Sequence, residues 1–345
     1  MTANDCTFRV AAEHRDRYLL LELGAPTAPL RPAVLAGRLR RSADPDDRPV
    51  VGDVVDIEAE GPDGVARITA VGARRSLLRR GAADRTSRGQ PLAANVDAVL
   101  VVVPLDRAPN PRRVEREVTL AWESGATPVV VLTKADLCPD VAAAESGVRL
   151  AAPGVEVVAV ATLRDDVASV MAPWLGSGAT VVLLGPSGAG KSTIANRLLG
   201  LDRQRTGGLR EDGAGRHTTT HRELLALPGG AWLIDTPGLR ALAMWSAGTA
   251  DDGDALRHTF ADVATLAYEC RFADCTHRSE PGCAVAAAVA AGALPADRLD
   301  SWRTLRAELA WQGARHDAAA RAERRAGERA GARSLRRRVR EKRGG

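Results

Sequence analysis

Residues 180–192 read TVVLLGPSGAGKS, and this stretch decides the fold class. Its first five residues, Thr180–Leu184, form an apolar run of strand length, and Gly185–Ser192 fit the pattern GxxxxGK[ST]. The next residues, 193–199 (TIANRLL), have helical character. In this strand–loop–helix order, glycines let backbone N–H groups wrap phosphate oxygens at a helix N-terminus. The stretch therefore predicts a P-loop within an α/β domain, although a glycine-rich turn is the simpler alternative.

The P-loop pattern assigns a chemical role to its last residues. The ammonium group of Lys191 is expected to reach the β- and γ-phosphates, and the Ser192 hydroxyl is expected to ligate magnesium. The predicted phosphate-binding residues are Gly185, Pro186, Ser187, Gly188, Ala189, Gly190, Lys191, Ser192 and Thr193.

A second motif, Asp235–Gly238 (DTPG), follows the apolar run Trp232–Ile234. A carboxylate at the end of a strand can hold magnesium, so Asp235 is a predicted magnesium ligand. The N–H group of Gly238 is predicted to contact the γ-phosphate. On its own, DTPG is also a common turn sequence. Its position after the P-loop favours the nucleotide-binding interpretation.

Residues 133–136 (TKAD) follow another apolar run, 128–132, and resemble the guanine-specificity element of GTPases, with Thr133 where Asn is commoner. Asp136 would accept two hydrogen bonds from guanine, the Lys134 stem would lie across the ring, and Ala135 lies between them. Adenine offers no such donor pair, so GTP is favoured over ATP. Lysine itself is rare in this chain, and two of its three lysines, Lys134 and Lys191, fall in these motifs.

Between the P-loop and DTPG, residues 215–220 (GRHTTT) form a polar segment that is expected to be a switch region. Thr219 is the predicted magnesium ligand and γ-phosphate contact. Leu239 follows DTPG where many GTPases carry a glutamine that positions water, so His217 is the candidate for that role. A solvated loop histidine is an equal alternative. The fifth GTPase element is degenerate, with Val160-Ala161 in its place, and Ala161 is its candidate residue.

The order of these motifs is unusual. The base-reading motif at 133–136 precedes the P-loop at 185–192, whereas ordinary GTPases have it last. The sequence therefore predicts a circularly permuted GTPase domain. Permutation can preserve a site that is built on strand ends, because the termini of compact domains are often close together.

Four further ligand-type residues fall within fourteen positions, in the spacing C-x4-C-x-H-x5-C. Three thiolates and an imidazole complete a tetrahedron, which predicts one closed structural Zn²⁺ site. Buried or redox-active cysteines are the alternative. Cys6 and Cys138 lie apart and are not assigned to this site. The predicted zinc ligands are Cys270, Cys275, His277 and Cys283.

The composition bounds the remaining possibilities. The chain has 345 residues, of which 45% are hydrophobic and 26% charged, which argues against disorder or fibrous repeats for most of the chain and allows two or three domains. Its net charge is +5, but residues 313–345 alone carry 12 Arg/Lys and 4 Asp/Glu, so the rest of the chain sums to −3. No leader sequence and no apolar run of about 20 residues is found, so we expect a cytoplasmic protein without membrane contact.

The distribution of apolar and polar residues divides the chain into regions. Short apolar runs separated by Gly, Pro and Asp, among them 18–23, 34–39, 50–57 and 65–71, predict an N-terminal β-barrel of about five strands. A barrel that binds nucleic acid is favoured over a generic β-module, which is the alternative. From Asp97 onward, apolar strands alternate with helices, as in a parallel α/β sheet, and helices dominate after Ala241. The expected regions are a barrel over 1–85, the permuted GTPase over 86–243, a helical zinc domain over 244–312 and an Arg-rich tail over 313–345.

Together these motifs resemble the RsgA (YjeQ) family of GTPases that depend on the small ribosomal subunit. The resemblance includes residues 93–97 (AANVD), the GRHTTT segment and CRFADCTHRSEPGC at 270–283. It implies a multidomain α/β protein with an N-terminal OB-fold, a central circularly permuted P-loop GTPase and a C-terminal helical zinc-binding domain. It also implies hydrolysis of GTP to GDP with Mg²⁺, stimulated by the small subunit during its late maturation, and rRNA contacts by the barrel and zinc domain. A monomer is expected.

Two other functions fit the same motifs. The protein could be a ribosome-binding scaffold that uses GTP only as an ordering ligand, or a permuted GTPase that serves another RNA. The Arg-rich tail is expected either to contact RNA phosphates or to form a solvated helix.

Overall fold

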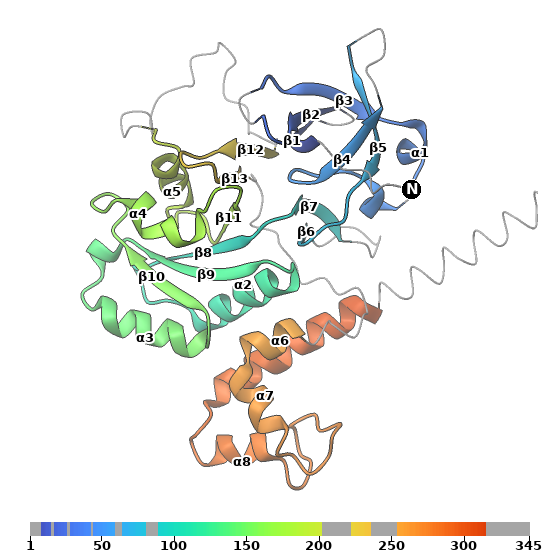
Figure 1. The fold of residues 1–345 in the computed structure, drawn as a ribbon. Coiled ribbons are helices and arrows are strands. Elements are labelled where there is room, and N and C mark those ends of the chain that lie inside the picture. The colour runs from blue at the N-terminus through green and yellow to red at the C-terminus, as the bar shows by residue number, and fades with distance from the viewer. Residues whose placement is uncertain are drawn as a thin grey trace, which may run out of the picture.

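The structure is a computed structural model in which residues 8–14, 17–25, 28–42, 44–58, 64–80, 89–201, 222–235 and 254–314 are described. Three parts follow one another along the chain, namely a β-barrel, an α/β domain and a helical region (Figure 1). This arrangement confirms the fold class expected from the sequence. None of the helices within the described ranges has the length and apolarity needed to cross a bilayer.

The N-terminal part is a closed five-stranded barrel, as predicted. The strands run in the order β1-β2-β3-β5-β4, and β4 pairs back with β1 to close the barrel. Strands β3 and β5 are parallel, and the other neighbours are antiparallel. The strands are β1 (Phe8–His14), β2 (Arg17–Glu22), β3 (Arg31–Leu35), β4 (Val54–Glu58) and β5 (Ala66–Val71).

One predicted strand of the barrel is shorter than expected. The apolar run over 34–39 does not form one strand, because β3 ends at Leu35 and a single helical turn, α1 (Gly37–Arg40), follows. Leu39 is nevertheless buried in the barrel core, so its apolar character reports burial and not extended backbone. A 3-10 turn, η1 (Pro45–Asp47), lies between α1 and β4.

The central part is a parallel sheet in the order β10-β9-β8-β11-β13, with β12 antiparallel at the edge of β13. The apolar runs predicted at 128–132, 180–184 and 232–234 match β9, β11 and β13 within one residue at each end, whereas β12 was missed. The strands are β8 (Ala98–Pro104), β9 (Thr127–Thr133), β10 (Glu156–Val160), β11 (Thr180–Leu184), β12 (Arg222–Ala226) and β13 (Trp232–Asp235).

Helices cover both faces of this sheet. Alternate residues of β8 show it, since Val99 and Val101 face one apolar cluster and Leu100 and Val102 face another. The first cluster contains residues of α2 and α3, and the second contains residues of α4 and α5. Because both faces of the sheet are buried, each of these strands is a continuous run of apolar residues in the sequence. The helices are α2 (Pro111–Glu123), α3 (Val141–Ala151), α4 (Val167–Met171) and α5 (Lys191–Leu198), with 3-10 turns η2 (Ala135–Leu137) and η3 (Ala172–Trp174).

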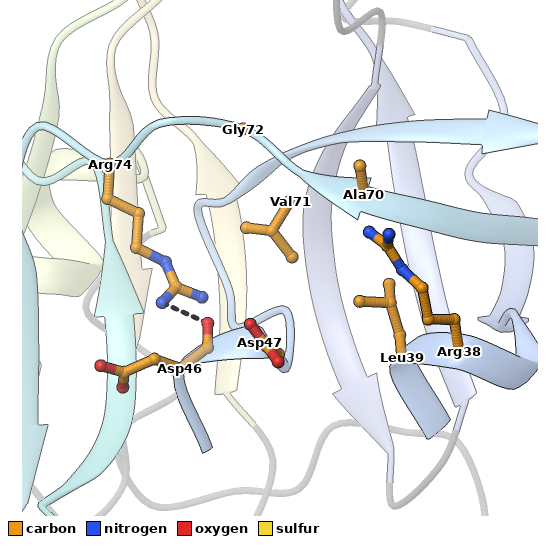
Figure 2. A pocket seen from close by; sticks show the side chains of 8 residues that line it. All are labelled: Arg38, Leu39, Asp46, Asp47, Ala70, Val71, Gly72 and Arg74. Atoms are coloured by element: carbon orange, nitrogen blue, oxygen red, sulfur yellow. Dashed lines mark hydrogen bonds between the residues drawn. The ribbon is translucent and has the colours of Figure 1, made fainter. Parts of the chain in front are cut away.

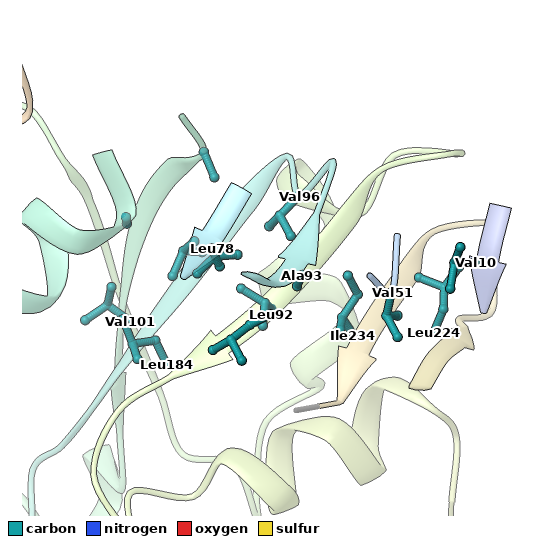
Figure 3. Packing of buried hydrophobic residues seen from close by; sticks show 14 of the residues in the cluster. Val10, Val51, Leu78, Leu92, Ala93, Val96, Val101, Leu184, Leu224 and Ile234 are labelled. Atoms are coloured by element: carbon teal, nitrogen blue, oxygen red, sulfur yellow. The ribbon is translucent and has the colours of Figure 1, made fainter. Parts of the chain in front are cut away.

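The barrel and the α/β sheet are continuous with each other. Strand β12 pairs with β1, so that eleven strands form one sheet. Figure 3 shows Val10, Val51, Leu224 and Ile234 close together where the two parts meet. A separate two-stranded sheet, β6 (Leu77–Arg80) and β7 (Gln90–Ala94), lies between them in sequence.

Buried polar groups complete this contact, which we call the barrel interface and define by β1, β12, Arg9 and Asn95. The Arg9 guanidinium donates to Gly52 O (3.2 Å) and to Thr180 Oγ1 (2.8 Å), and thereby joins β1 to the first residue of β11. Asn95 Nδ2 also donates to Gly52 O (3.0 Å). Gly52 has φ +95°, and a Cβ there would lie 2.1 Å from Ala94 O, so the close approach requires glycine.

The C-terminal part is helical, as expected, and contains α6 (Asp254–Thr259), α7 (Ala261–Ala267), α8 (Ala284–Ala290) and a helix over 296–314. Its core is built around Phe260, which is fully buried. Leu120 of α2 packs into the same core, so the α/β domain contributes to it. Figure 1 shows this part beside α2.

Charged side chains of α2 hold the C-terminal part. We call this contact the α2 interface and define it by Glu115, Arg116, Arg298 and Glu308. Arg298 is 7% exposed and donates to Glu115 Oε1 (2.8 Å) and to both carboxylate oxygens of Asp262 (2.5 and 2.9 Å). Arg116 forms a two-bond pair with Glu308 at 2.5 and 2.8 Å.

Candidate nucleotide and metal sites

The predicted P-loop occupies the connection between β11 and α5. Strand β11 ends at Leu184 and α5 begins at Lys191, which matches the predicted strand–loop–helix order. Gly185 has φ +148°, and a Cβ on it would lie 2.4 Å from Val102 O on the neighbouring strand. Gly190 has φ +98° and is the N-cap residue of α5. Both positions therefore require glycine, which explains the motif sterically.

Lys191 folds back over the loop that precedes it. Its Nζ donates to Gly185 O (2.8 Å) and to Pro186 O (2.7 Å). The ammonium group therefore lies inside the turn that precedes α5. Backbone N–H groups at the N-terminus of a helix favour the binding of phosphate. Ser192, the next residue of α5, is exposed to solvent.

The guanine motif lies against the P-loop. Thr133, the last residue of β9, is fully buried, and its hydroxyl donates to Ala189 O at 2.6 Å. The side chain of Thr133 also lies 3.6 Å from the position of a Cβ on Gly190. Threonine at the position where asparagine is commoner therefore contacts the phosphate loop directly, and the two motifs form one site.

Two side chains that the sequence analysis did not assign contact the guanine motif. Lys134 has φ +59°, and its Nζ pairs with Asp106 Oδ2 at 2.5 Å. The hydrogen bond from Lys134 holds the pKa of Asp106 below its ordinary value. Arg164 lies 3.9 Å from Asp136, the predicted guanine acceptor. Asp106 comes shortly after the end of β8, at the same edge of the sheet. This position after an apolar strand is the sequence feature that could have identified Asp106 as a residue of the site.

Ala161 follows β10 at the same edge of the sheet, but its donor group is already used. The N–H of Ala161 donates to Asp165 Oδ2 at 2.7 Å. A contact between Ala161 and the base remains a prediction, and it would require this bond to be exchanged or shared.

Asp235 is the last residue of β13, which runs parallel to β11 with Trp232 opposite Thr180. Asp235 and the P-loop consequently lie at the same carboxyl edge of the sheet. The Ser192 hydroxyl and the Asp235 carboxylate are oxygen donors of the kind that Mg²⁺ prefers, so the residues present fit this ion. The other predicted residues of this site, His217, Thr219 and Gly238, lie outside the described residues.

The four predicted metal ligands come together in the C-terminal part. Their ligand atoms all lie within 4.8 Å of one another. Cys270 Sγ lies 3.9 Å from Cys283 Sγ, and His277 Nδ1 lies 3.6 and 3.5 Å from these two sulfurs. Two thiolates bound to one tetrahedral zinc ion at about 2.3 Å lie about 3.8 Å apart. The donor set and its dimensions therefore fit a metal ion of this kind.

The loop around this cluster is held in shape by several polar contacts. Glu280 accepts hydrogen bonds from the N–H groups of Thr276 (2.9 Å) and Arg278 (2.8 Å), and these contacts, with the Thr276 hydroxyl, hold the pKa of Glu280 far below its ordinary value. Arg303, on the helix over 296–314, donates to His277 O. Burial lowers the pKa of His277, which favours the neutral imidazole that binds metals.

A cavity of about 250 Å³ opens on the barrel. Figure 2 shows Arg38 and Leu39 on one side of it and Arg74 with Asp46 on the other. Arg74 donates to Asp46 O (2.9 Å) and pairs with the buried Asp53 at 2.7 Å. The charged group of Arg74 therefore already has partners within the barrel, and so does the Asp53 carboxylate.

Comparison with known proteins identifies the family. The family model for the RsgA GTPase matches residues 71–245. A small ribosomal subunit biogenesis GTPase RsgA from Opitutus terrae is 48% identical over 328 residues, which cover 92% of this chain and 87% of that protein. The chain belongs to the RsgA GTPase family. A protein of the same name from Streptomyces coelicolor is 52% identical over 254 residues, 72% of this chain and 68% of that protein.

Two solved structures support the RsgA fold. YjeQ from Thermotoga maritima gives a TM-score of 0.64 at 22% identity, covering 88% of this chain and 97% of that one. YloQ, described as a circularly permuted GTPase, gives 0.60 at 22% identity, covering 88% and 95%. At this identity the likeness concerns the fold, and it matches the permuted order of motifs seen here.

Proposed function

We propose that this protein hydrolyses GTP to GDP and phosphate in the late maturation of the small ribosomal subunit, and that the small subunit stimulates the reaction. The hydrogen bond from Thr133 to Ala189 carries the proposal for the nucleotide, because it joins a guanine-reading motif to a phosphate loop. The names of the RsgA relatives supply the ribosomal context. We propose the cytoplasm as the location of this activity, and the ribosomal context of the relatives supports it.

In this mechanism Asp136 reads guanine and Lys191 holds the β- and γ-phosphates. Ser192, Asp235 and Thr219 would hold a magnesium ion with the bound GTP, and the ion would supply positive charge that offsets the charge of the phosphates. Lys191 stabilises charge on the bridging oxygen as the bond breaks, and His217 positions the attacking water. Ala161 adds a contact to the base.

We also propose that one structural zinc ion is held by the cluster of Cys270, Cys275, His277 and Cys283. Four protein ligands leave no open position on a tetrahedral ion, so its role is to fix the loop. The barrel and this loop are proposed to contact rRNA, with the Arg-rich tail as an additional phosphate contact. The protein acts as a monomer.

The first experiment removes the bond that joins the two motifs. In Thr133→Val the shape is kept and the hydroxyl is lost, so we expect about 10-fold weaker GTP binding, which corresponds to about 1.4 kcal/mol. Thr127→Val, at the exposed start of the same strand, is the matched control. Equal affinity of both variants for GTP would contradict the proposed arrangement of the site.

The second experiment separates an enzyme from a scaffold. Single-turnover hydrolysis is measured with and without small subunits, for the unmodified protein and for Lys191→Ala, with Arg197→Ala on the same helix as control. Strong stimulation that Lys191→Ala abolishes supports the enzyme. Binding of GTP and small subunits without stimulation would instead establish the scaffold function.

A further inference from the structure

The lysine of the guanine motif is paired with a residue that lies outside that motif. Lys134 Nζ lies 2.5 Å from Asp106 Oδ2, and the two side chains are 28% and 35% exposed. A second cation, Arg107, lies farther from the Asp106 carboxylate, at 3.8 Å, and its side chain is 66% exposed. Lys134 is therefore the main partner of Asp106. The function proposed above gives this carboxylate no role.

The sheet fixes the position of Asp106 between the two halves of the nucleotide site. Strand β8 lies between β9, which leads into the guanine motif, and β11, which leads into the P-loop (Figure 1). The end of β8 contacts both: Leu105 N donates to Thr133 O (2.9 Å), and Val102 O lies 2.4 Å from the position of a Cβ on Gly185. Asp106 directly follows Leu105, so its backbone is tied to the guanine motif.

This placement suits a carboxylate that anchors the Lys134 side chain. The stem of a lysine packs on an apolar surface while its ammonium group stays hydrated or paired. An ammonium group without a fixed partner would draw the stem into solvent, and the stem would then leave the base. The backbone of Lys134 is held in the left-handed region, with φ +59°. Asp106 fixes the other end of this side chain.

The same pair keeps the ammonium group of Lys134 away from the carboxylate that reads the base. Asp136 comes two residues after Lys134 and is the nearest acidic residue along the chain. Guanine offers Asp136 two N–H donors, and an ammonium group bound there would compete with them. The cation beside Asp136 in the structure is Arg164, at 3.9 Å and with a 73% exposed side chain. Such an exposed contact is weak, so guanine can replace it.

We propose that Asp106 is a positioning residue for guanine recognition, and that it acts through Lys134. Its carboxylate holds the Lys134 ammonium group, so that the stem lies along the base and Asp136 stays available to the two donors of guanine. This role of Asp106 rests on the proposed function of the protein as a GTPase. It adds a residue of the loop after β8 to the base-reading motif at 133–136.

The test measures how the full-length protein binds GDP and inosine diphosphate, whose base lacks the N2 amino group, by isothermal titration calorimetry. Asp106→Asn keeps the shape of the side chain and removes its charge. We expect about 10-fold weaker binding of GDP and about 3-fold weaker binding of inosine diphosphate, because guanine has more to lose when Lys134 competes at Asp136. A merely structural role would weaken both nucleotides equally. Asp106→Glu keeps the carboxylate and should restore most of the preference for GDP.

Two further variants make the result specific. Glu145→Gln is the matched control, because Glu145 on α3 also lies beside one arginine, Arg149 at 3.8 Å, and is 31% exposed. It should bind both nucleotides like the unmodified protein. In Lys134→Met the ammonium group is absent, so adding Asp106→Asn should not weaken GDP binding further. Thermal unfolding shows whether each variant is folded.

Three results would overturn the role of Asp106. They are an unchanged ratio of the two affinities in Asp106→Asn, tighter GDP binding by this variant, and a further loss of affinity when it is added to Lys134→Met. Failure of the proposed function would look different, because the unmodified protein would then bind GDP no more tightly than ADP. In that case Asp106 would have no guanine to position.

Discussion

The two interfaces that flank the α/β domain are built differently. The barrel interface uses backbone pairing between β1 and β12, and Arg9 and Asn95 there donate to backbone carbonyls. The α2 interface has a different basis, since its contacts are mainly between ionised side chains such as Arg298 with Glu115 and Arg116 with Glu308. Backbone pairing cannot be removed by one substitution, whereas an ion pair can. The C-terminal part should therefore separate from the α/β domain more readily than the barrel does.

The largest expected effect comes from the metal cluster, which lies beyond the α2 interface. Structural zinc sites contribute roughly 10 kcal/mol or more to folding. Cys275→Ser, or treatment with a chelator, should unfold the loop that Arg303 holds to the helix over 296–314. Hydrogen exchange should then accelerate in that helix and remain slow in β1 and β12.

Cys138→Ser is the matched control, because Cys138 lies outside the metal cluster. If the amides of β1 and β12 exchanged faster to the same extent, the two interfaces would belong to one cooperative unit, and the contrast between them would be wrong.

The next effect is expected at Arg298. Replacing Arg298 by Met leaves Glu115, which is 3% exposed, without its cation. Removing one partner of a buried pair costs about 3–5 kcal/mol. Denaturant unfolding should show this loss, and the double variant Arg298→Met/Glu115→Leu should recover most of it. Failure of the double variant to recover stability would show that the interface depends on packing more than on charge.

A smaller effect is expected at Arg9 of the barrel interface. Burial lowers its pKa to about 10, so the guanidinium remains charged at neutral pH. Its partners Gly52 O and Thr180 Oγ1 are neutral, so Arg9→Met leaves no buried charge without its counter-ion, whereas Arg298→Met leaves the buried Glu115 carboxylate unpaired with a cation. Arg9→Met should therefore cost less than Arg298→Met in the same unfolding experiment. The reverse order would contradict the comparison.

The motifs of the candidate site can be recognised in the sequence, whereas the contacts of the two interfaces cannot, for a physical reason. The P-loop at 185–192 and the cysteine cluster at 270–283 are local patterns, in which the chemistry fixes both residue type and spacing. The parallel strands were also predictable, because burial on both faces makes them continuously apolar. Strand β12 was missed because RELLA at 222–226 has charged residues at its start and only one buried residue, Leu224, so it is not a continuous apolar run.

The polar pairs at the two interfaces could not be recognised in the sequence, because their partners are far apart along the chain. Arg9 and Thr180 are 171 residues apart, and Glu115 and Arg298 are 183 apart, so neither pair appears in any local pattern. The segment 93–97 (AANVD) was noticed only through the family resemblance. Its reason is structural, because Asn95 bonds to Gly52 O at the barrel interface and Asp97 Oδ2 accepts from Thr180 N at 2.8 Å.

The smallest expected effect concerns Arg116 and Glu308, whose side chains are 35% and 27% exposed. Partial exposure weakens their attraction through solvent and salt, so we expect a coupling energy of about 0.5–1 kcal/mol from a double-mutant cycle with Arg116→Gln and Glu308→Gln. The coupling should fall as the salt concentration rises. The pair Arg112–Asp297 at the same interface is 61% and 88% exposed and should give no measurable coupling. Equal coupling for both pairs would mean that solvent exposure does not set the strength of this interface, and that its stability resides in Arg298 and the packing of Leu120 alone.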